Sequence, residues 1–495
     1  MLYNRAYVSA KCGDVDKALE LWGKASALKG KIGDVSGQVK SIHNMASLLA
    51  SHDQPGKALE LLSEAFALET RVDASRSIMS TKLKSLKIER YKYLAPGTHL
   101  VFNDTFNVLL GQNGTGKTTL LDLITRIVAG DFSSLKSEAF AIEYQLSYPG
   151  LTITAGLSND TAKWSSKLTV QIEGLPAAYT IAATPFGTTL EIVDQPGSSI
   201  PIRLATPFDP GHLAGALLEI AEIVEPVHQE PLFAAAVLSA QIAETLFRFD
   251  EALGGFQIMT GTPPADRSGS GLSARFEFSK NHRLAPGLRA FLPAQLWSRL
   301  TALMPELLAA KGGRLPHTEV DFLKKAVDIM HFNEAEMSLR LQKKDVNAGV
   351  ERLIHGDFEF LFTLRDGSII NQNDLSYGQK RLLAFLYYVA ANEHILVADE
   401  LVNGLHHEWI ETCRDEIESR QSFLTSQNPL LLDFLFFSSA NDVRKTFILC
   451  RQEDRDGRST MVAENLSEDE AGAFYRAYQT EVQHVSEILR SKGLW

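Results

Sequence analysis

The chain has 495 residues, of which 45% are hydrophobic and 22% charged, the composition of an ordinary folded protein with room for about two to four domains. Its formal net charge of −11 excludes a surface that is basic throughout, so a contact with nucleic acid would require a local basic patch. The chain has no run of about 18 apolar residues, no signal-peptide pattern and no metal-ligand spacing among its three cysteines, which predicts a cytoplasmic protein without a membrane partner.

Residues 1–75 contain a helical repeat. The segment Ala-Leu-Glu-Leu that begins at Ala18 recurs at Ala58, about 40 residues later, and each copy opens an amphipathic helix. The pattern resembles tetratricopeptide helix hairpins. Because fewer than two repeats are present and a stable stack needs about three, we expect this segment to dock on the rest of the chain or to bind a partner. A plain helical bundle without a binding role is the alternative.

Residues 76–106 predict two strands, over 84–88 and 99–102. Tyr91 and Tyr93 lie between them, just upstream of the loop described next, where either ring can stack on a purine base or simply be a core or surface aromatic. The stretch is also the most basic of the chain. Its cations can indicate a contact with nucleic acid, or they can simply cover a solvated strand face, which is the commoner explanation. Its cations are Lys82, Lys84, Lys87, Arg90 and Lys92.

A phosphate-binding loop follows. An apolar strand pattern leads into the motif G-x-x-x-x-G-K-[ST], and an amphipathic helix comes after it. In such a loop the backbone N–H groups wrap the phosphates, Lys117 reaches the β- and γ-phosphates, and the Thr118 hydroxyl ligates Mg²⁺. The sequence therefore predicts an ATP site with Mg²⁺ as its metal. The residues expected to contact nucleotide are Gly111, Gln112, Asn113, Gly114, Thr115, Gly116, Lys117, Thr118 and Thr119.

An antiparallel sheet is predicted beyond the first helix. Its strand patterns are separated by Gly, Pro and Asn-Asp turn signals and cover 140–148, 167–172, 179–183 and 188–193. Gln145 ends the first of these strands and is a candidate sensor of the γ-phosphate and a candidate Mg²⁺ ligand.

The next segment, residues 205–350, is predicted to be mostly helical. No long heptad run is present, so no extended coiled-coil arm is expected. A flexible loop interrupts the helices at 262–271. The helices are predicted over 211–227, 231–253, 286–311 and 318–346.

An acid pair marks the region 357–450. Here an apolar strand over 395–398 is followed by Asp399 and Glu400. An acid at the carboxyl end of a buried strand lies beside the Mg²⁺ of a phosphate-loop enzyme, and the next acid can polarise an attacking water. Acid pairs also cap strands without catalysis, but the phosphate loop upstream favours Asp399 as metal support and Glu400 as the base.

The order of these motifs resembles the ABC-type ATPases, and within them the branch of structural-maintenance-of-chromosomes, RecF-like and overcoming-lysogenization-defect (OLD) proteins. The resemblance rests on the phosphate loop, the Leu-Ser-Tyr-Gly-Gln segment at 375–379, the acid pair and the Asn-Gly-Leu-His segment at 403–406. It implies that two copies close face to face on ATP, with each ATP between the phosphate loop of one copy and the signature of the other. Ser376, Gly378 and Gln379 would then contact the γ-phosphate of the opposite copy.

Three departures from that family affect the expected rate. Tyr377 replaces a signature glycine, Leu401 stands where a proline is common, and Gln427 stands at the switch position where a histidine usually reads the γ-phosphate. Because glutamine can donate a hydrogen bond but cannot carry charge, turnover is expected to be slow or conditional. The pair His406-His407 can suggest a metal, but a loop that communicates across the dimer explains it better.

The predicted fold class is α/β: a phosphate-loop NTPase with an ABC-type head, made of a mixed sheet, an antiparallel β-lobe and a helical insertion, behind an N-terminal α-helical repeat segment. The expected divisions are tetratricopeptide-like hairpins (1–75), the first half of the head with the β-lobe (76–204), the helical insertion (205–350), the second half of the head (351–450) and a strand–helix tail (451–495). The tail predicts a strand over 459–463 and a helix over 467–489, with no nuclease constellation.

The favoured function is an ATPase with Lys117, Asp399, Glu400 and Gln427 as its catalytic residues, which forms an ATP-dependent homodimer. Resemblance to OLD-like and Septu-type ATPases suggests bacterial anti-phage defence with an effector nuclease encoded separately and bound through the helical repeats. Two alternatives remain open: an ATP-gated sensor or scaffold with little turnover, and a RecF-like ATPase of DNA repair.

Overall fold

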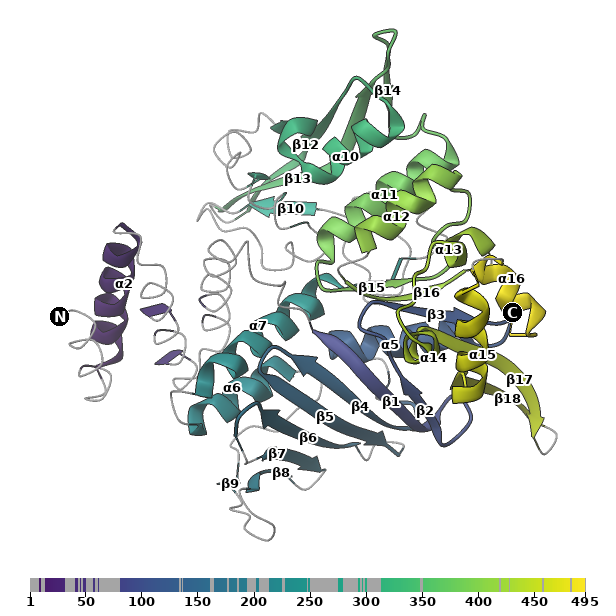
Figure 1. The fold of residues 1–495 in the computed structure, drawn as a ribbon. Coiled ribbons are helices and arrows are strands. Elements are labelled where there is room, and N and C mark those ends of the chain that lie inside the picture. The colour runs from purple at the N-terminus through teal and green to yellow at the C-terminus, as the bar shows by residue number, and fades with distance from the viewer. Residues whose placement is uncertain are drawn as a thin grey trace. The chain divides into compact units, whose positions relative to one another are not determined.

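The computed structural model describes residues 14–31, 81–132, 137–160, 164–175, 178–184, 187–193, 202–203, 213–224, 228–246, 248–249, 275–278, 313–347, 350–417, 420–426, 428–455, 458–480 and 483–494, and positions 9, 41–42, 45, 48–49, 57, 61, 135, 293, 296 and 299–300. The chain forms two compact units (Figure 1). The first comprises Met1–Leu83 and Gly130–Ala243, and the second Lys84–Ala129 and Glu244–Trp495.

The first unit contains the expected antiparallel sheet. Consecutive strands pair in chain order: β4 (Phe140–Tyr148), β5 (Leu151–Asn159), β6 (Trp164–Ile172), β7 (Ala178–Thr184), β8 (Gly187–Val193) and β9 (Ile202–Arg203). Strand β5 was not predicted. Every second residue of β4 and β5 is buried, as expected for strands with one face on a core. Gly150, with φ of 74°, permits the two-residue turn between them.

The helices of the first unit that lie on described residues are α2 (Val15–Lys31), α6 (Leu213–Ile223) and α7 (Gln229–Thr245). The Tyr148 hydroxyl lies 2.7 Å from Ser239 Oγ and so joins β4 to α7. In α2, Trp22 is buried in a small core with Ile42 and Met45. Most of the second predicted repeat lies outside the described residues, so the tetratricopeptide likeness remains a prediction.

The second unit is built on a five-stranded sheet in the order β15-β16-β3-β17-β18 (Figure 1). The first four strands are parallel, and β18 runs antiparallel to β17. All residues of β15 and β16 are buried, the pattern of parallel strands covered on both faces. The bounds are β3 (Phe106–Leu110), β15 (Ile395–Ala398), β16 (Gln421–Thr425), β17 (Phe447–Arg455) and β18 (Arg458–Asn465).

Helices and a hairpin complete this core. Strands β1 (Lys82–Tyr91) and β2 (Thr98–Val101) pair antiparallel. The helices are α5 (Lys117–Ala129), α11 (Tyr377–Ala391), α12 (His407–Ile417), α13 (Pro429–Asp433), α14 (Ala440–Thr446), α15 (Glu468–Tyr478) and α16 (Val485–Ser491).

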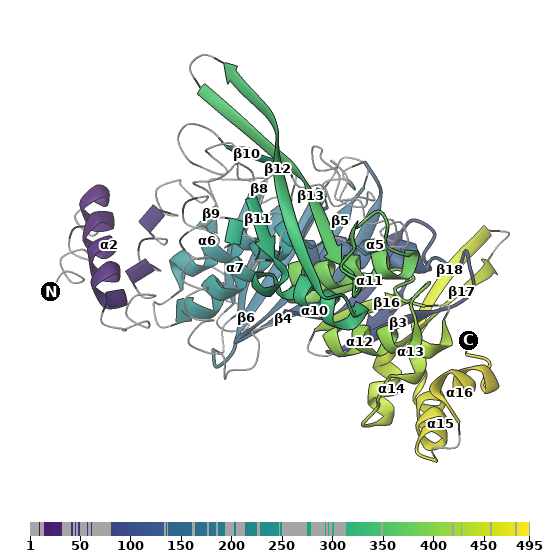
Figure 2. The same cartoon turned by 90° about the horizontal axis from the view of Figure 1, so that it is seen from above.

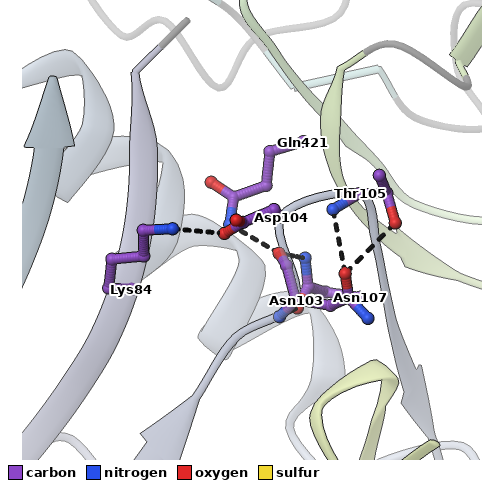
Figure 3. Close-up of polar contacts among 6 residues, drawn as sticks. All are labelled: Lys84, Asn103, Asp104, Thr105, Asn107 and Gln421. Atoms are coloured by element: carbon purple, nitrogen blue, oxygen red, sulfur yellow. Dashed lines mark hydrogen bonds and ion pairs between the residues drawn. The ribbon is translucent and has the colours of Figure 1, made fainter. Parts of the chain in front are cut away.

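A buried polar cluster fixes the amino end of β3 against β16 (Figure 3). Asn107 is fully buried, and its Oδ1 accepts the Asn103 N–H at 2.7 Å. Its amide nitrogen donates to the carbonyl oxygens of Asn103 at 3.0 Å and Ser422 at 3.1 Å. Gln421 Nε2 donates to the same Asn103 carbonyl at 2.8 Å. Because these bonds tie the turn before β3 to the start of β16, they set the register that brings the carboxyl ends of the two strands together.

The second sheet of this unit corrects the prediction of a helix over 318–346. The helical part of that stretch is short and consists of the 3₁₀ turn η5 (His317–Glu319) and α10 (Asp321–Met330). The residue after α10, His331, has the left-handed conformation with φ of 59°, which ends the helix. Strand β12 then begins at Glu334. Its apolar residues Ala335, Met337 and Leu339 are buried at every second position, the period of a strand, and Ser338 between the last two is buried as well. Good helix formers are abundant in this sequence, but pairing with the next strand overrides their propensity.

Residues 205–350, which were predicted to be mostly helical, contain the helices α6, α7 and α10 and also strands. The strands of the second sheet are β10 (Arg275–Phe278), β11 (Gly313–Pro316), β12 (Glu334–Asn347), β13 (Val350–Thr363) and β14 (Ile369–Asn371). Figure 2 shows β12 and β13 as a long paired ribbon.

The tail also differs from its prediction, because the single helix expected over 467–489 is divided into α15 and α16. Ser467 caps α15, and the backbone N–H of His484 donates to Glu487 at 3.1 Å at the start of α16. His484, which precedes α16, has extended backbone, and this interrupts helical geometry between the two segments. Among the described residues, no helix is long and apolar enough to cross a membrane.

Candidate nucleotide site

The loop between β3 and α5 has backbone that only glycine accommodates. Gly111 and Gly116 have φ of 148° and 86°. A Cβ on Gly111 would lie 2.1 Å from the carbonyl oxygen of Cys450, and one on Gly116 would lie 2.0 Å from Sδ of Met461. Since β17 and β18 supply these two neighbours, the loop is held closely against the sheet. The positive φ favours glycine at both positions, and at Gly111 a backbone carbonyl also leaves no space for a Cβ.

A buried cation closes the loop. Lys117 is the first residue of α5, and its Nζ donates to the carbonyl oxygens of Gly111 at 2.7 Å and Gln112 at 2.9 Å. This ammonium and the helix N-terminus give the loop a positive potential that suits phosphate. The other expected contact residues vary in exposure: Gln112, Asn113, Gly114 and Thr118 are exposed, Thr119 is half-buried and Thr115 is buried.

The acid pair lies at the carboxyl end of β15, beside the first turn of α5. The Thr118 hydroxyl donates to Asp399 Oδ2 at 2.7 Å, a contact between residues far apart in the sequence. Parallel pairing explains it, because β15, β16 and β3 end at the same edge of the sheet. Glu400, the next residue, has φ of 53°, an uncommon value for a residue other than glycine.

Thr425 is a site residue whose role the sequence did not reveal. It ends β16, is fully buried, and its hydroxyl donates to Asp399 Oδ1 while accepting the Glu400 N–H at 2.9 Å. One hydroxyl thus links both acids. The only sequence signal is its position at the end of an apolar strand, directly before the switch segment.

Phe249 is a second residue that the sequence did not indicate. Phe249 lies beside β15 and forms a parallel bridge with Ala398 of that strand. Its N–H donates to the carbonyl oxygen of Val397 at 2.9 Å, and its own carbonyl oxygen accepts the Asp399 N–H at 2.7 Å. The neighbouring Arg248 forms an ion pair with Asp122 of α5 at 2.6 Å. The backbone N–H of Asp399 is therefore held by Phe249.

The donor set fits Mg²⁺. Thr118 and Asp399 offer a hydroxyl and a carboxylate, which are hard oxygen ligands, and Mg²⁺ is commonly held by one or two such groups together with substrate phosphates. In the part of the chain that the structure describes, no three His, Cys, Asp or Glu side chains gather as a metal site. The rings of His406 and His407 instead contact Trp409 and Phe434, with centroid separations of 6.4 and 5.3 Å.

The signature segment forms the start of α11. Ser376 is its N-cap: Ser376 Oγ accepts the Gln379 N–H at 3.3 Å, and Gln379 Oε1 accepts the Ser376 N–H at 2.9 Å. Gly378 packs closely on the 403–406 loop, since a Cβ there would lie 2.7 Å from the carbonyl oxygen of Gly404. The ring of Tyr377 lies directly against the Gly404 α-carbon, so this bulky residue contacts a loop of its own chain.

Two predicted sensors of the γ-phosphate are not placed in this site. Gln427 lies outside the described residues. Gln145 lies within β4, opposite Thr154, and not at the strand end as predicted. It belongs to the first unit, whereas the phosphate loop belongs to the second.

The structure also distinguishes between the two tyrosines upstream of the loop and shows ion pairs in the basic stretch. Tyr91 is buried, whereas Tyr93 is 73% exposed, so only Tyr93 has a ring available for a base. Its carbonyl accepts the N–H of Met461, the residue that packs on Gly116. In the basic stretch, Lys84 pairs with Asp104 at 2.6 Å and Lys87 with Glu89 at 2.8 Å, as on a solvated strand face.

The strand order, glycine cradle and strand-end acids define a phosphate-loop NTPase, and comparison with known families agrees. Residues 264–433 match the family described as "AAA domain, putative AbiEii toxin, Type IV TA system", and residues 85–161 match another described as "AAA domain". Each match covers less than half of the chain, so these parts are similar to AAA domains, and the phosphate loop between β3 and α5 agrees with ATP binding. No curated protein matches the chain.

Three solved structures resemble the chain weakly. An Smc head bound to the C-terminal winged-helix domain of ScpA is 13% identical, with a TM-score of 0.36, covering 78% of this chain and 98% of that one. The SMC head domain from Thermotoga maritima is 12% identical, with a TM-score of 0.29 and coverages of 78% and 99%. RecF bound to ATPγS, of the RecFOR pathway, is 13% identical, with a TM-score of 0.28 and coverages of 79% and 100%. TM-scores this low carry no argument, and the phosphate-loop NTPase fold is assigned here from the strand order and the loop of this chain.

Proposed function

We propose that the protein is a Mg²⁺-dependent ATPase that closes as a homodimer on ATP and is reset by hydrolysis. The observation that carries the proposal is the continuous polar connection from α5 to both acids: Thr118 to Asp399, Asp399 to Thr425, and Thr425 to the backbone of Glu400. A purely structural strand cap would not require the phosphate loop at its end.

Each residue has a defined part in this proposal. Lys117 turns from the loop carbonyls to the β- and γ-phosphates and offsets charge that develops during transfer. Thr118 and Asp399 hold Mg²⁺, which supplies further charge neutralisation when bound. Glu400 orients a water and accepts its proton as the water attacks the γ-phosphorus, and ADP leaves with the bridging oxygen. Thr425 keeps the two acids in one arrangement.

The composite site would be completed by a second copy. Ser376 is exposed at the N-terminus of α11, a 15-residue helix, where it can face a γ-phosphate from another chain. Gly378 and Gln379 belong to the same turn, and residues 403–406 are packed on it. Gln427 and Gln145 are retained as candidate sensors of the γ-phosphate.

For the biological setting we favour defence against phage. The family matched by residues 264–433 is described as a putative AbiEii toxin of a type IV toxin–antitoxin system, which supports a defence role over DNA repair. A separate effector, such as a nuclease, would bind through the N-terminal helices. A contact with nucleic acid has no specific support, because two lysines of the basic stretch are already paired.

The first test is the turnover of Glu400→Gln. We expect kcat to fall by about 10²- to 10⁴-fold with ATP binding retained, because glutamine keeps the shape but cannot accept a proton. Glu468→Gln is the control, since that side chain is 86% exposed on α15. Wild-type turnover by Glu400→Gln would exclude Glu400 as the base. No multiple turnover by the wild type with any candidate partner would favour the ATP-gated scaffold instead.

The second test is the solution mass of Glu400→Gln by light scattering, with and without ATP and Mg²⁺. A dimer that forms only with ATP would support the composite site. A mass that ATP does not change would contradict ATP-driven closure: a constant dimer would indicate assembly through another surface, and a constant monomer would fit a head held open by Tyr377.

A further inference from the structure

Arg381 is a buried cation that the catalytic scheme above does not use. It lies on α11, five residues after Ser376. With 0% exposure, it is the largest fully buried side chain among the described residues. A buried guanidinium needs several acceptors to offset its loss of hydration. Its complete burial therefore calls for a physical explanation.

The guanidinium binds the backbone of Glu400, the proposed base. Arg381 Nε donates to the carbonyl oxygen of Leu401 at 3.0 Å, and a terminal nitrogen donates to the carbonyl oxygen of Glu400. The Glu400 N–H is held by Thr425 at 2.9 Å. Both backbone polar groups of Glu400 are thus fixed by buried side chains, one from α11 and one from β16.

This fixation matters because Glu400 has φ of 53°. The left-handed region is unfavourable for a residue with a Cβ and persists only where the surroundings impose it. The backbone conformation sets the direction in which the Glu400 side chain leaves the strand end. A change at either anchor would therefore move the carboxylate relative to a water on the γ-phosphate.

The same guanidinium is itself oriented by the segment that holds Asp399. Its carbon lies 5.1 Å from the ring centroid of Phe249, a cation–π distance, and the Phe249 carbonyl accepts the Asp399 N–H at 2.7 Å. Arg381 thereby joins three parts of the second unit: the signature helix, the acid pair and the strand-like segment at Phe249.

We propose that Arg381 is a positioning residue, which fixes the backbone of Glu400 and connects the signature helix that carries Ser376 to the base. This inference rests on the proposed ATPase function. It implies that a displacement of α11, as when Ser376 engages a partner, is transmitted to Glu400 through one side chain. Loss of Arg381 would then impair the chemical step more than ATP binding.

The experiment compares Arg381→Met, Arg381→Lys and Lys380→Met in the full-length protein. Lys380 is a half-buried neighbour on the same helix, so Lys380→Met controls for loss of a positive charge on α11. Stopped-flow fluorescence with a labelled ATP analogue gives Kd, and phosphate release gives kcat. For Arg381→Met we expect kcat to fall roughly tenfold to a hundredfold while Kd changes by less than about threefold. Arg381→Lys, which keeps one donor, should recover part of kcat, and Lys380→Met should resemble the wild type.

Parallel losses of Kd and kcat, or no difference between Arg381→Met and Arg381→Lys, would show that the residue only supports the fold and would overturn the proposal. Hydrogen–deuterium exchange of the peptide around residues 399–405 provides a readout that needs no turnover. We expect faster exchange there in Arg381→Lys than in Lys380→Met, and equal exchange would refute the anchor. If the wild type hydrolyses no ATP, the proposed function fails while the exchange result still decides the anchor.

Discussion

Replacing Thr425 with valine should show what its hydroxyl contributes to the acid pair, because the packing of the surrounding fold is left unchanged. The two side chains have nearly the same shape, so the packing of this fully buried position is kept and only the hydroxyl is lost. That hydroxyl donates to the carboxylate of Asp399 and accepts the N–H of Glu400. Thr425→Val therefore removes a side-chain atom that contacts both acids.

The expected cost follows from these two bonds. One is a bond to a charged group, and removal of the other leaves a part-buried N–H without that acceptor. Together they predict a loss of about 2–4 kcal/mol from the free energy of unfolding. Because both acids lose an anchor, kcat should also fall roughly tenfold to a hundredfold.

The assay pairs urea unfolding with phosphate release, and Thr446→Val is the matched control. Thr446 is also buried, and its hydroxyl accepts one neutral bond, from Asn103 Nδ2 at 3.1 Å. That variant should lose about 1 kcal/mol and keep its kcat. If Thr425→Val keeps the wild-type kcat, or if both variants lose kcat equally, the argument that this hydroxyl organises the acids is refuted.

Three further predictions follow from the same structure. Gly116→Ala should abolish ATP binding in equilibrium dialysis, because its Cβ would meet Met461 at 2.0 Å and its φ of 86° disfavours alanine; binding with unchanged Kd would contradict this. Asn107→Leu should lower the free energy of unfolding by about 2–5 kcal/mol in a urea titration, because it leaves buried backbone groups without partners; an unchanged midpoint would show that the cluster in Figure 3 is dispensable. Burial raises the pKa of the Cys450 thiol to about 12, with the nearby Lys117 opposing the rise. The thiol is thus protonated and unreactive across neutral pH, so iodoacetamide at pH 8 should modify Cys450 only after unfolding, and peptide mass spectrometry that finds rapid labelling in the folded protein would exclude this environment.

The sequence alone determined the features that depend on neighbouring residues. The glycines and lysine of the loop and the acids after an apolar strand are local patterns whose physical requirements are met within a few residues. The structure confirms the loop between β3 and α5 and the strand before Asp399. The catalytic and metal roles assigned to these residues remain predictions.

Only the tertiary structure decided the features that depend on pairing across long distances. Strand β12 replaced a predicted helix because its partner β13 satisfies its backbone, which composition alone does not specify. Tyr91 and Tyr93 are equivalent as sequence, but one is buried and the other exposed. Thr425 and Arg381 become meaningful only when parallel strands and a packed helix bring them to the acids, since a hydroxyl or a guanidinium acts through the atoms it meets in space.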